Sequence, residues 1–100
     1  MVAVAGGSKI PLADYATFGT DQLAANAVSA LSGGYKACLL ANHGQIAFAG
    51  TLGKALELAA EVETLARQYI DVLGLGGGHV LDGGEMERVI AKFRSYGKQA

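Results

Sequence analysis

Charged residues and cysteine are scarce in this chain of 100 residues. Only 17% of its residues are charged, compared with about 25% in an ordinary soluble domain. Eight Lys and Arg stand against nine Asp and Glu, so the chain lacks the basic surplus that attracts nucleic acid or an anionic membrane. A single cysteine excludes an internal disulfide and favours a reducing, cytoplasmic location.

Long apolar runs are also missing, although 51% of the residues are hydrophobic. No run approaches the roughly 20 residues of a membrane span, and no signal-peptide pattern opens the sequence. The surplus of apolar over charged residues predicts that part of the surface is covered, either by another chain or by further polypeptide of the same protein. We therefore expect the isolated chain to oligomerise or to be poorly soluble.

Two short apolar runs separated by a turn predict a β-hairpin. The runs are Ala37–Ala41 and Gln45–Ala49, and each is too short for a helix. Asn42-His43-Gly44 lies between them, and both Asn and Gly tolerate the positive φ of tight turns. Strands that are apolar on successive residues are usually covered on both faces. The pattern thus favours an α/β fold in which helices flank the hairpin on both sides.

Capping residues and apolar periodicity predict three helices in one domain without repeats or linkers. They run from Asp21 to about Leu31 after the cap Thr20, from Leu52 to about Leu73 after the cap Thr51, and from Gly83 to about Tyr96 after the capping pair Asp82 and Glu85. The long helix has an apolar arc too wide for a single core contact, so we expect it to pack on two partners. The predicted order of elements begins with a strand before the first helix. Ile10–Leu12 is predicted to be extended or an edge strand, because Pro11 has no amide proton.

The side chains able to bind a metal are few. His43 lies in the hairpin turn, His79 lies in a glycine-rich loop where an exposed imidazole is expected, and Cys38 lies in an apolar strand as a small hydrophobe. Taken alone, Asn-His-Gly is more often a plain turn than a metal site. A zinc site needs three or four protein ligands, and no HxH, HxxxH or CxxC spacing exists here. The chain therefore cannot complete a zinc site by itself.

Phosphate-loop and serine-nucleophile motifs are absent too. The glycines at 74–78 follow a helix and no Lys-Ser/Thr follows them, so we interpret them as a helix stop and connector. No serine lies in a nucleophile-elbow context. Spacing alone assigns the aromatic residues to core or interface packing: Tyr15, Phe18, Phe93 and Tyr96.

Four segments, taken in order, resemble a known family. They are PLADYATFGT from Pro11, KACLLANHG from Lys36, LGKALELAAEVETLARQY from Leu52 and KFRSYG from Lys92. Together they are similar to the C-terminal half of zinc-dependent class II aldolases, in the fuculose-phosphate aldolase branch of the aldolase, epimerase and adducin superfamily. The resemblance covers nearly the whole chain, so residues 1–100 are expected to form the C-terminal portion of such a domain.

This resemblance implies an α/β/α sandwich with a mostly antiparallel sheet, assembled as a tetramer with active sites between subunits. It implies cleavage of a ketose phosphate, such as fuculose 1-phosphate, into dihydroxyacetone phosphate and an aldehyde, with zinc held by three histidines. His43 matches the third of these. Phe18, Phe93 and Tyr96 match aromatic residues that wall the aldehyde side of the pocket across a subunit boundary.

The departures from the family pattern are equally informative. The HxH zinc ligands, the catalytic glutamate, the phosphate-binding residues and the proton-donor tyrosine of the family would all fall before Met1. Asn42 stands where the pattern often has a second histidine, and Gly83-Gly84 replaces acidic residues. We therefore expect no activity without the other half of the domain. A non-catalytic, adducin-like interaction module and a sugar-phosphate epimerase or dehydratase remain alternatives.

Overall fold

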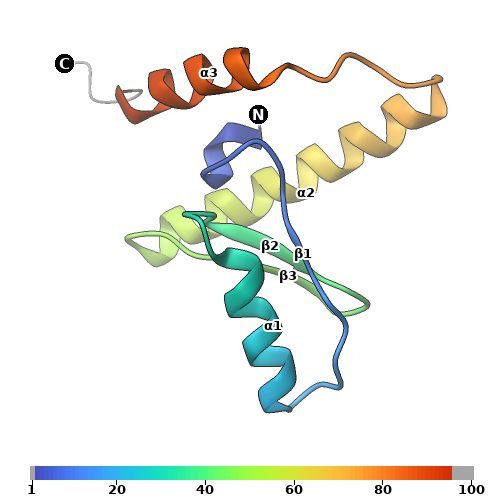
Figure 1. Cartoon of the computed structure of the whole chain (residues 1–100), viewed down its shortest axis with the longest axis vertical. Helices are drawn as coiled ribbons and strands as arrows, with labels where there is room; N and C mark the ends of the chain where they lie inside the picture. Colours follow the sequence, from blue (N-terminus) through green and yellow to red (C-terminus); the bar gives the residue numbers. More distant parts are fainter. Residues whose placement is uncertain (1, 96–100) are drawn as a thin grey trace.

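The computed structural model describes residues 2–95 and has an α/β architecture (Figure 1). The elements in chain order are the 3₁₀ helix η1 (Val2–Ala5), β1 (Leu12–Ala13), α1 (Asp21–Leu31), β2 (Ala37–Leu40), β3 (Gly44–Ala47), α2 (Leu52–Gly74) and α3 (Gly83–Ser95). No helix within the described range is long and apolar enough to cross a membrane.

The predicted hairpin is confirmed as the pair β2 and β3, which are antiparallel with Cys38 opposite Ile46. The second strand ends at Ala47, two residues earlier than expected. β1 adds to the other edge of β2 in parallel, with Leu12 opposite Leu39. The three described strands therefore form a mixed sheet, and the mostly antiparallel sheet that the resemblance implies for the whole domain stays an expectation.

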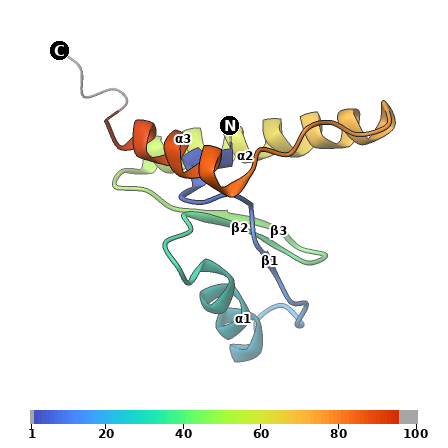
Figure 2. The ribbon, with the colours of Figure 1, turned by 45° about the horizontal axis from the view of Figure 1, so that its top comes forward.

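Helices cover the sheet from both sides, as the apolar strands predicted. α1 contacts β1 and β2, while α2 contacts β2 and β3. Figure 2 shows α1 and α2 on opposite sides of the sheet. The buried core lies between α2, η1 and the sheet, and consists of Ala5, Ala37, Leu58 and Val62 with Ile10, Leu39 and Ala47 packed against it.

All three predicted N-caps are present. Thr20 accepts a hydrogen bond from the amide of Leu23, and Thr51 accepts one from the amide of Lys54, each 3.2 Å long. Asp82 accepts the amide of Glu85 at 2.8 Å. The Glu85 side chain does not complete a reciprocal box in the bonds observed; its carboxylate pairs with Arg88 at 2.8 Å instead.

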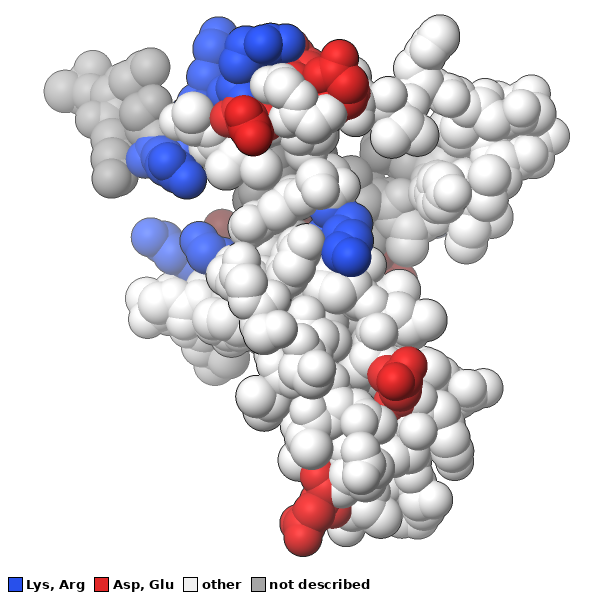
Figure 3. All heavy atoms as spheres, viewed as in Figure 1, with Lys and Arg blue, Asp and Glu red and all other residues white. Residues whose placement is uncertain are grey.

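The surface is sparsely charged, in keeping with the composition. In Figure 3, acidic and basic side chains gather over α3 at the top, while most of the remaining face is uncharged. The C-terminal part of α2 extends past the sheet in both ribbon views (Figures 1 and 2). Its Tyr69 and Ile70 are 60% and 68% exposed. Much of the second apolar face predicted for this helix is thus uncovered in the single chain.

The opening segment Val2–Ala5 forms a 3₁₀ turn, and the segment predicted to be extended or an edge strand, Ile10–Leu12, leads into β1. The Ala5 carbonyl accepts the amide of Lys36 at 2.7 Å, which ties this turn to the start of β2. Gly6 then turns the chain with a φ of 96° and lies against the Gly34 carbonyl oxygen. A side chain at residue 6 would collide with that backbone.

We expect Gly6→Ala to lower the free energy of unfolding more than Gly34→Ala. Both residues have φ near 90°, so each substitution carries the roughly 1–2 kcal/mol penalty of the left-handed region. Only Gly6 adds a backbone collision, since nothing lies within 4 Å of a Cβ at Gly34. Urea unfolding of the two variants measures the difference, and equal losses would refute a close approach at Gly6.

Candidate functional site

The hairpin turn presents His43 on the surface. Asn42 adopts the left-handed conformation with a φ of 66°, and the His43 amide donates to the Leu40 carbonyl at 2.9 Å. Two paired strands lead into this turn, so the backbone that carries the imidazole is rigid. The side chain is exposed, as a ligand-binding histidine at a hairpin tip requires.

Two contacts hold the His43 ring. Its Nε2 atom lies 2.8 Å from the carbonyl oxygen of Ala16. The ring of Tyr15 stacks on it with a centroid separation of 5.4 Å and an interplanar angle of 13°. Because a carbonyl can only accept, Nε2 carries the proton in this contact. Nδ1 is then left with the free lone pair that a metal ion needs.

A metal site cannot be completed from the described residues. No group of three or more His, Cys, Asp or Glu within residues 2–95 could hold a metal ion. His79 is exposed in the loop before α3. Cys38 is fully buried, and burial raises the pKa of its thiol, so it stays a neutral apolar side chain as predicted. The donor chemistry fits one ligand of a zinc site, supplied by His43.

Phe18 and Phe93, two of the aromatic residues matched by the resemblance, lie on different and separate elements of the described chain. Phe18 is 79% exposed in the connection between β1 and α1, the connection that also carries Tyr15. Phe93 is half-buried on α3. In Figures 1 and 2, the C-terminal end of α3 lies far from the hairpin turn. Tyr96 lies outside the described residues.

Gln45 connects the hairpin to α2. Its amide Nε2 donates to the Ala59 carbonyl at 3.0 Å and to the Glu63 carboxylate at 3.2 Å. Its Oε1 atom is buried and has no hydrogen-bond partner among the described residues. In the sequence, Gln45 stands only as the first residue of a predicted apolar strand. The signal in the sequence was that Gln45 is a polar residue in an otherwise apolar run, which indicates that its side chain has a hydrogen-bond partner.

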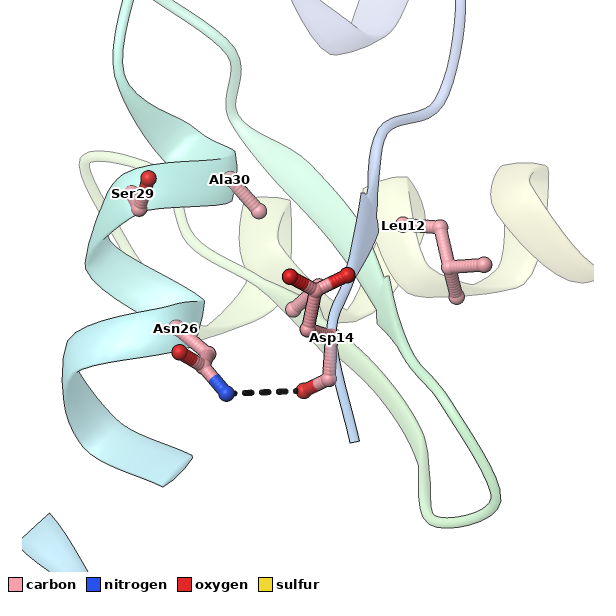
Figure 4. Close-up of a pocket in the computed structure, with 6 residues that line it drawn as sticks. Leu12, Asp14, Asn26, Ser29 and Ala30 are labelled. Carbon is pink, nitrogen blue, oxygen red and sulfur yellow. Dashed lines mark hydrogen bonds between the residues drawn. The ribbon is translucent and has the colours of Figure 1, made fainter. Parts of the chain in front are cut away.

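A small cavity of about 110 Å³ lies between β1 and α1, behind the segment that contacts His43. It is lined by Leu12, Ala13, Asp14, Asn26, Ser29 and Ala30. Figure 4 shows the Asn26 amide directed at the main chain of Asp14, where Nδ2 donates to the carbonyl oxygen at 3.1 Å. Neither residue was a candidate from the sequence, because their contact joins two elements.

Comparison with known proteins relates this arrangement to sugar-phosphate aldolases. The chain is 51% identical over 100 residues to a 5-methylthioribulose-1-phosphate/5-deoxyribulose-1-phosphate aldolase of Rhodospirillum rubrum; the match covers 100% of this chain and 45% of the relative. It is 47% identical over 98 residues to L-fuculose phosphate aldolase of Escherichia coli, covering 97% of this chain and 45% of that protein.

A solved structure of L-fuculose 1-phosphate aldolase superimposes with a TM-score of 0.88 at 43% identity, over 93% of this chain and 43% of that one. The chain therefore spans less than half the length of the relatives it matches. The family model described as "Class II Aldolase and Adducin N-terminal domain" matches residues 1–70. The chain belongs to the class II aldolase and adducin family.

Proposed function

We propose that this chain is the C-terminal portion of a sugar-phosphate aldolase whose active site is completed by polypeptide outside these 100 residues. The observation that carries the proposal is the exposed imidazole of His43, held by Tyr15 and Ala16 through its ring face and Nε2, which leaves Nδ1 without a contact observed to the described residues. One histidine on a rigid turn is a suitable ligand for a metal that other residues must also bind. More than half of each relative's length lies outside the match to this chain, and the additional metal ligands are proposed to lie in that unmatched part.

The proposed metal is zinc, and His43 is its ligand from this chain. When bound, zinc supplies Lewis-acid polarisation of the substrate carbonyl. This chain's own contribution is to present Nδ1 in a fixed direction, because Tyr15 restricts the ring plane and Ala16 holds the opposite nitrogen. Fixed direction matters because a misplaced ligand weakens both metal binding and catalysis.

The proposed substrate is a ketose 1-phosphate. The relatives named above act, by their names, on fuculose phosphate and on methylthioribulose or deoxyribulose 1-phosphate. Cleavage breaks the C3–C4 bond: the C4 hydroxyl gives up its proton as C4 becomes the aldehyde, and C3 of the other product, dihydroxyacetone phosphate, takes up one proton. Both events conserve electrons, so no redox partner is required.

We extend the proposal to a homo-oligomer in which Phe18, Phe93 and Tyr96 wall the aldehyde side of the pocket. Phe18 is largely exposed, and the C-terminal end of α3 lies far from the hairpin turn of its own chain. A neighbouring subunit could bring Phe93 to the hairpin, whereas the same chain does not. Uncovered apolar residues on α2 supply surface for such assembly. The complete domain is proposed to form an α/β/α sandwich.

Those uncovered residues also favour a second candidate, a non-catalytic interaction module of the adducin type. Tyr69, Ile70 and Leu73 are each more than half exposed on the projecting end of α2. In this alternative the helix binds a partner and His43 has no metal to hold. Zinc content separates the two candidates, because only the aldolase requires it.

The test joins this chain to the unmatched portion of the Rhodospirillum rubrum relative in one polypeptide. We expect the fusion to retain zinc after dialysis and to cleave 5-deoxyribulose 1-phosphate or fuculose 1-phosphate, while the 100-residue chain alone does neither. Metal analysis and a coupled assay for dihydroxyacetone phosphate measure both properties. Stoichiometric zinc and turnover from the chain alone would contradict the incomplete site, and a folded, zinc-free fusion would favour the interaction module.

A further inference from the structure

We infer that residues 14–17, anchored to α1 by Asn26, position the imidazole of His43. Tyr15 and Asn26 are thus positioning residues that act through His43. For catalysis the inference rests on the proposed function, whereas the geometry it describes belongs to this chain alone.

An exposed imidazole normally rotates about its χ angles and exchanges its proton between two nitrogens. His43 is restrained in both respects. The parallel Tyr15 ring, 5.4 Å away, sets the plane of the imidazole. The Ala16 carbonyl, 2.8 Å from Nε2, sets the rotation within that plane and selects the tautomer. Both contacts come from adjacent residues, so a shift of this one segment changes the plane and the tautomer together.

The segment is itself held at both ends. At its start, Asn26 Nδ2 donates to the Asp14 carbonyl at 3.1 Å, as Figure 4 shows. At its end, the Thr20 hydroxyl donates to the Thr17 carbonyl at 2.6 Å while capping α1. Tyr15 and Ala16 lie between these two anchors. Without them, an exposed connection of this kind would be mobile.

The direction of the Asn26 amide is also determined. Gln22, one turn earlier on α1, donates its Nε2 proton to Asn26 Oδ1 at 2.7 Å. Because the oxygen of Asn26 is occupied by this donor, its NH₂ group faces Asp14. A chain of contacts therefore runs from α1 through Asn26 and the main chain of Asp14 to Tyr15, Ala16 and His43. Metal-ligating histidines are usually oriented in this way, by neighbouring groups that hydrogen-bond to the ring nitrogen not bound to the metal.

The inference is tested by NMR on the 100-residue chain without metal or substrate. Histidine ring resonances are recorded at about pH 8.5, where an ordinary imidazole is neutral. His79, exposed in its loop, is the internal reference. In the parent chain, we expect the His43 ring protons upfield of those of His79 because of the Tyr15 ring current. We also expect His43 nitrogen shifts of a single Nε2–H tautomer, and averaged ones for His79.

The variants separate positioning from folding. Tyr15→Phe is expected to keep the upfield shift and Tyr15→Ala to lose it. Asn26→Ala is expected to move the His43 shifts most of the way toward those of His79, with backbone amide dispersion preserved. Ser29→Ala is the matched control, since Ser29 lies on the same helix and lines the same cavity without bonding residues 14–17. It should leave His43 unchanged.

Two results would overturn the inference: His43 shifts that match those of His79 in the parent chain, or equal effects of Asn26→Ala and Ser29→Ala. Neither depends on zinc or turnover, so the inference can fail while the proposed function stands. In the fusion, Asn26→Ala should lower zinc affinity by no more than the roughly 10- to 100-fold that follows the loss of a group in direct contact with a metal ligand, because Asn26 acts through residues 14–17, and Tyr15→Phe should retain the affinity.

Discussion

Replacing His43 by Ala in the fusion protein will remove its zinc and abolish aldol cleavage. His43 offers the one imidazole on the hairpin turn, and its Nδ1, the nitrogen that does not contact Ala16, is the atom that we propose binds the metal. A site with three protein ligands loses its geometry when one is removed. We expect the fall in kcat/KM to exceed the roughly 10- to 100-fold that accompanies loss of an outer-shell partner. Metal analysis after dialysis and steady-state kinetics measure the two effects.

The matched control is His79→Ala, which removes the other imidazole of the chain. His79 lies exposed in the loop before α3, and its loss should leave zinc content and turnover unchanged. Circular dichroism of both variants checks that the fold persists, which we expect because His43 is exposed. A His43→Ala fusion that keeps its zinc would show that the hairpin turn is not part of the metal site.

Leu58→Ala will lower the free energy of unfolding by about 2–5 kcal/mol, the range for truncating a buried leucine. Leu58 is 7% exposed and packs in the cluster that joins α2 to η1 and β2. The loss is large because a domain of this size is stable by only about 5–15 kcal/mol. Urea unfolding followed by circular dichroism measures the change.

Leu56→Ala is the comparison on the same helix. Leu56 is 70% exposed, so its truncation should cost less than about 0.5 kcal/mol in the single chain. Measuring both variants over a range of protein concentrations adds a check on assembly. An equally large loss for Leu56→Ala that grows with concentration would show that a second copy covers this face of α2.

Local sequence signals predicted most of the elements correctly. Thr20 and Thr51 cap the helices expected of them, and the Asn42 turn joins the expected strands. These features depend on contacts within a few residues, which spacing reveals. The long helix was correct to within a residue of its end for the same reason.

The errors and omissions involve contacts between distant segments. Val2–Ala5 forms a 3₁₀ turn that is bonded to Lys36, and β1 pairs in parallel with β2; residue spacing predicted neither contact. Tyr15 was assigned to packing, but it stacks on a histidine 28 positions later in the chain. Residue spacing carries no information on which surface side chains meet.

The sequence by itself determined the family and singled out His43 as the candidate ligand, because motifs such as KACLLANHG are properties of the chain order. The tautomer and the orientation of the His43 imidazole depend on the tertiary structure. Which nitrogen of His43 is free, and which residues hold its ring, depend on bringing the segment before α1 against the hairpin turn. Packing of α1 on β1 and β2 sets that approach, through contacts that exist only after the sheet has formed.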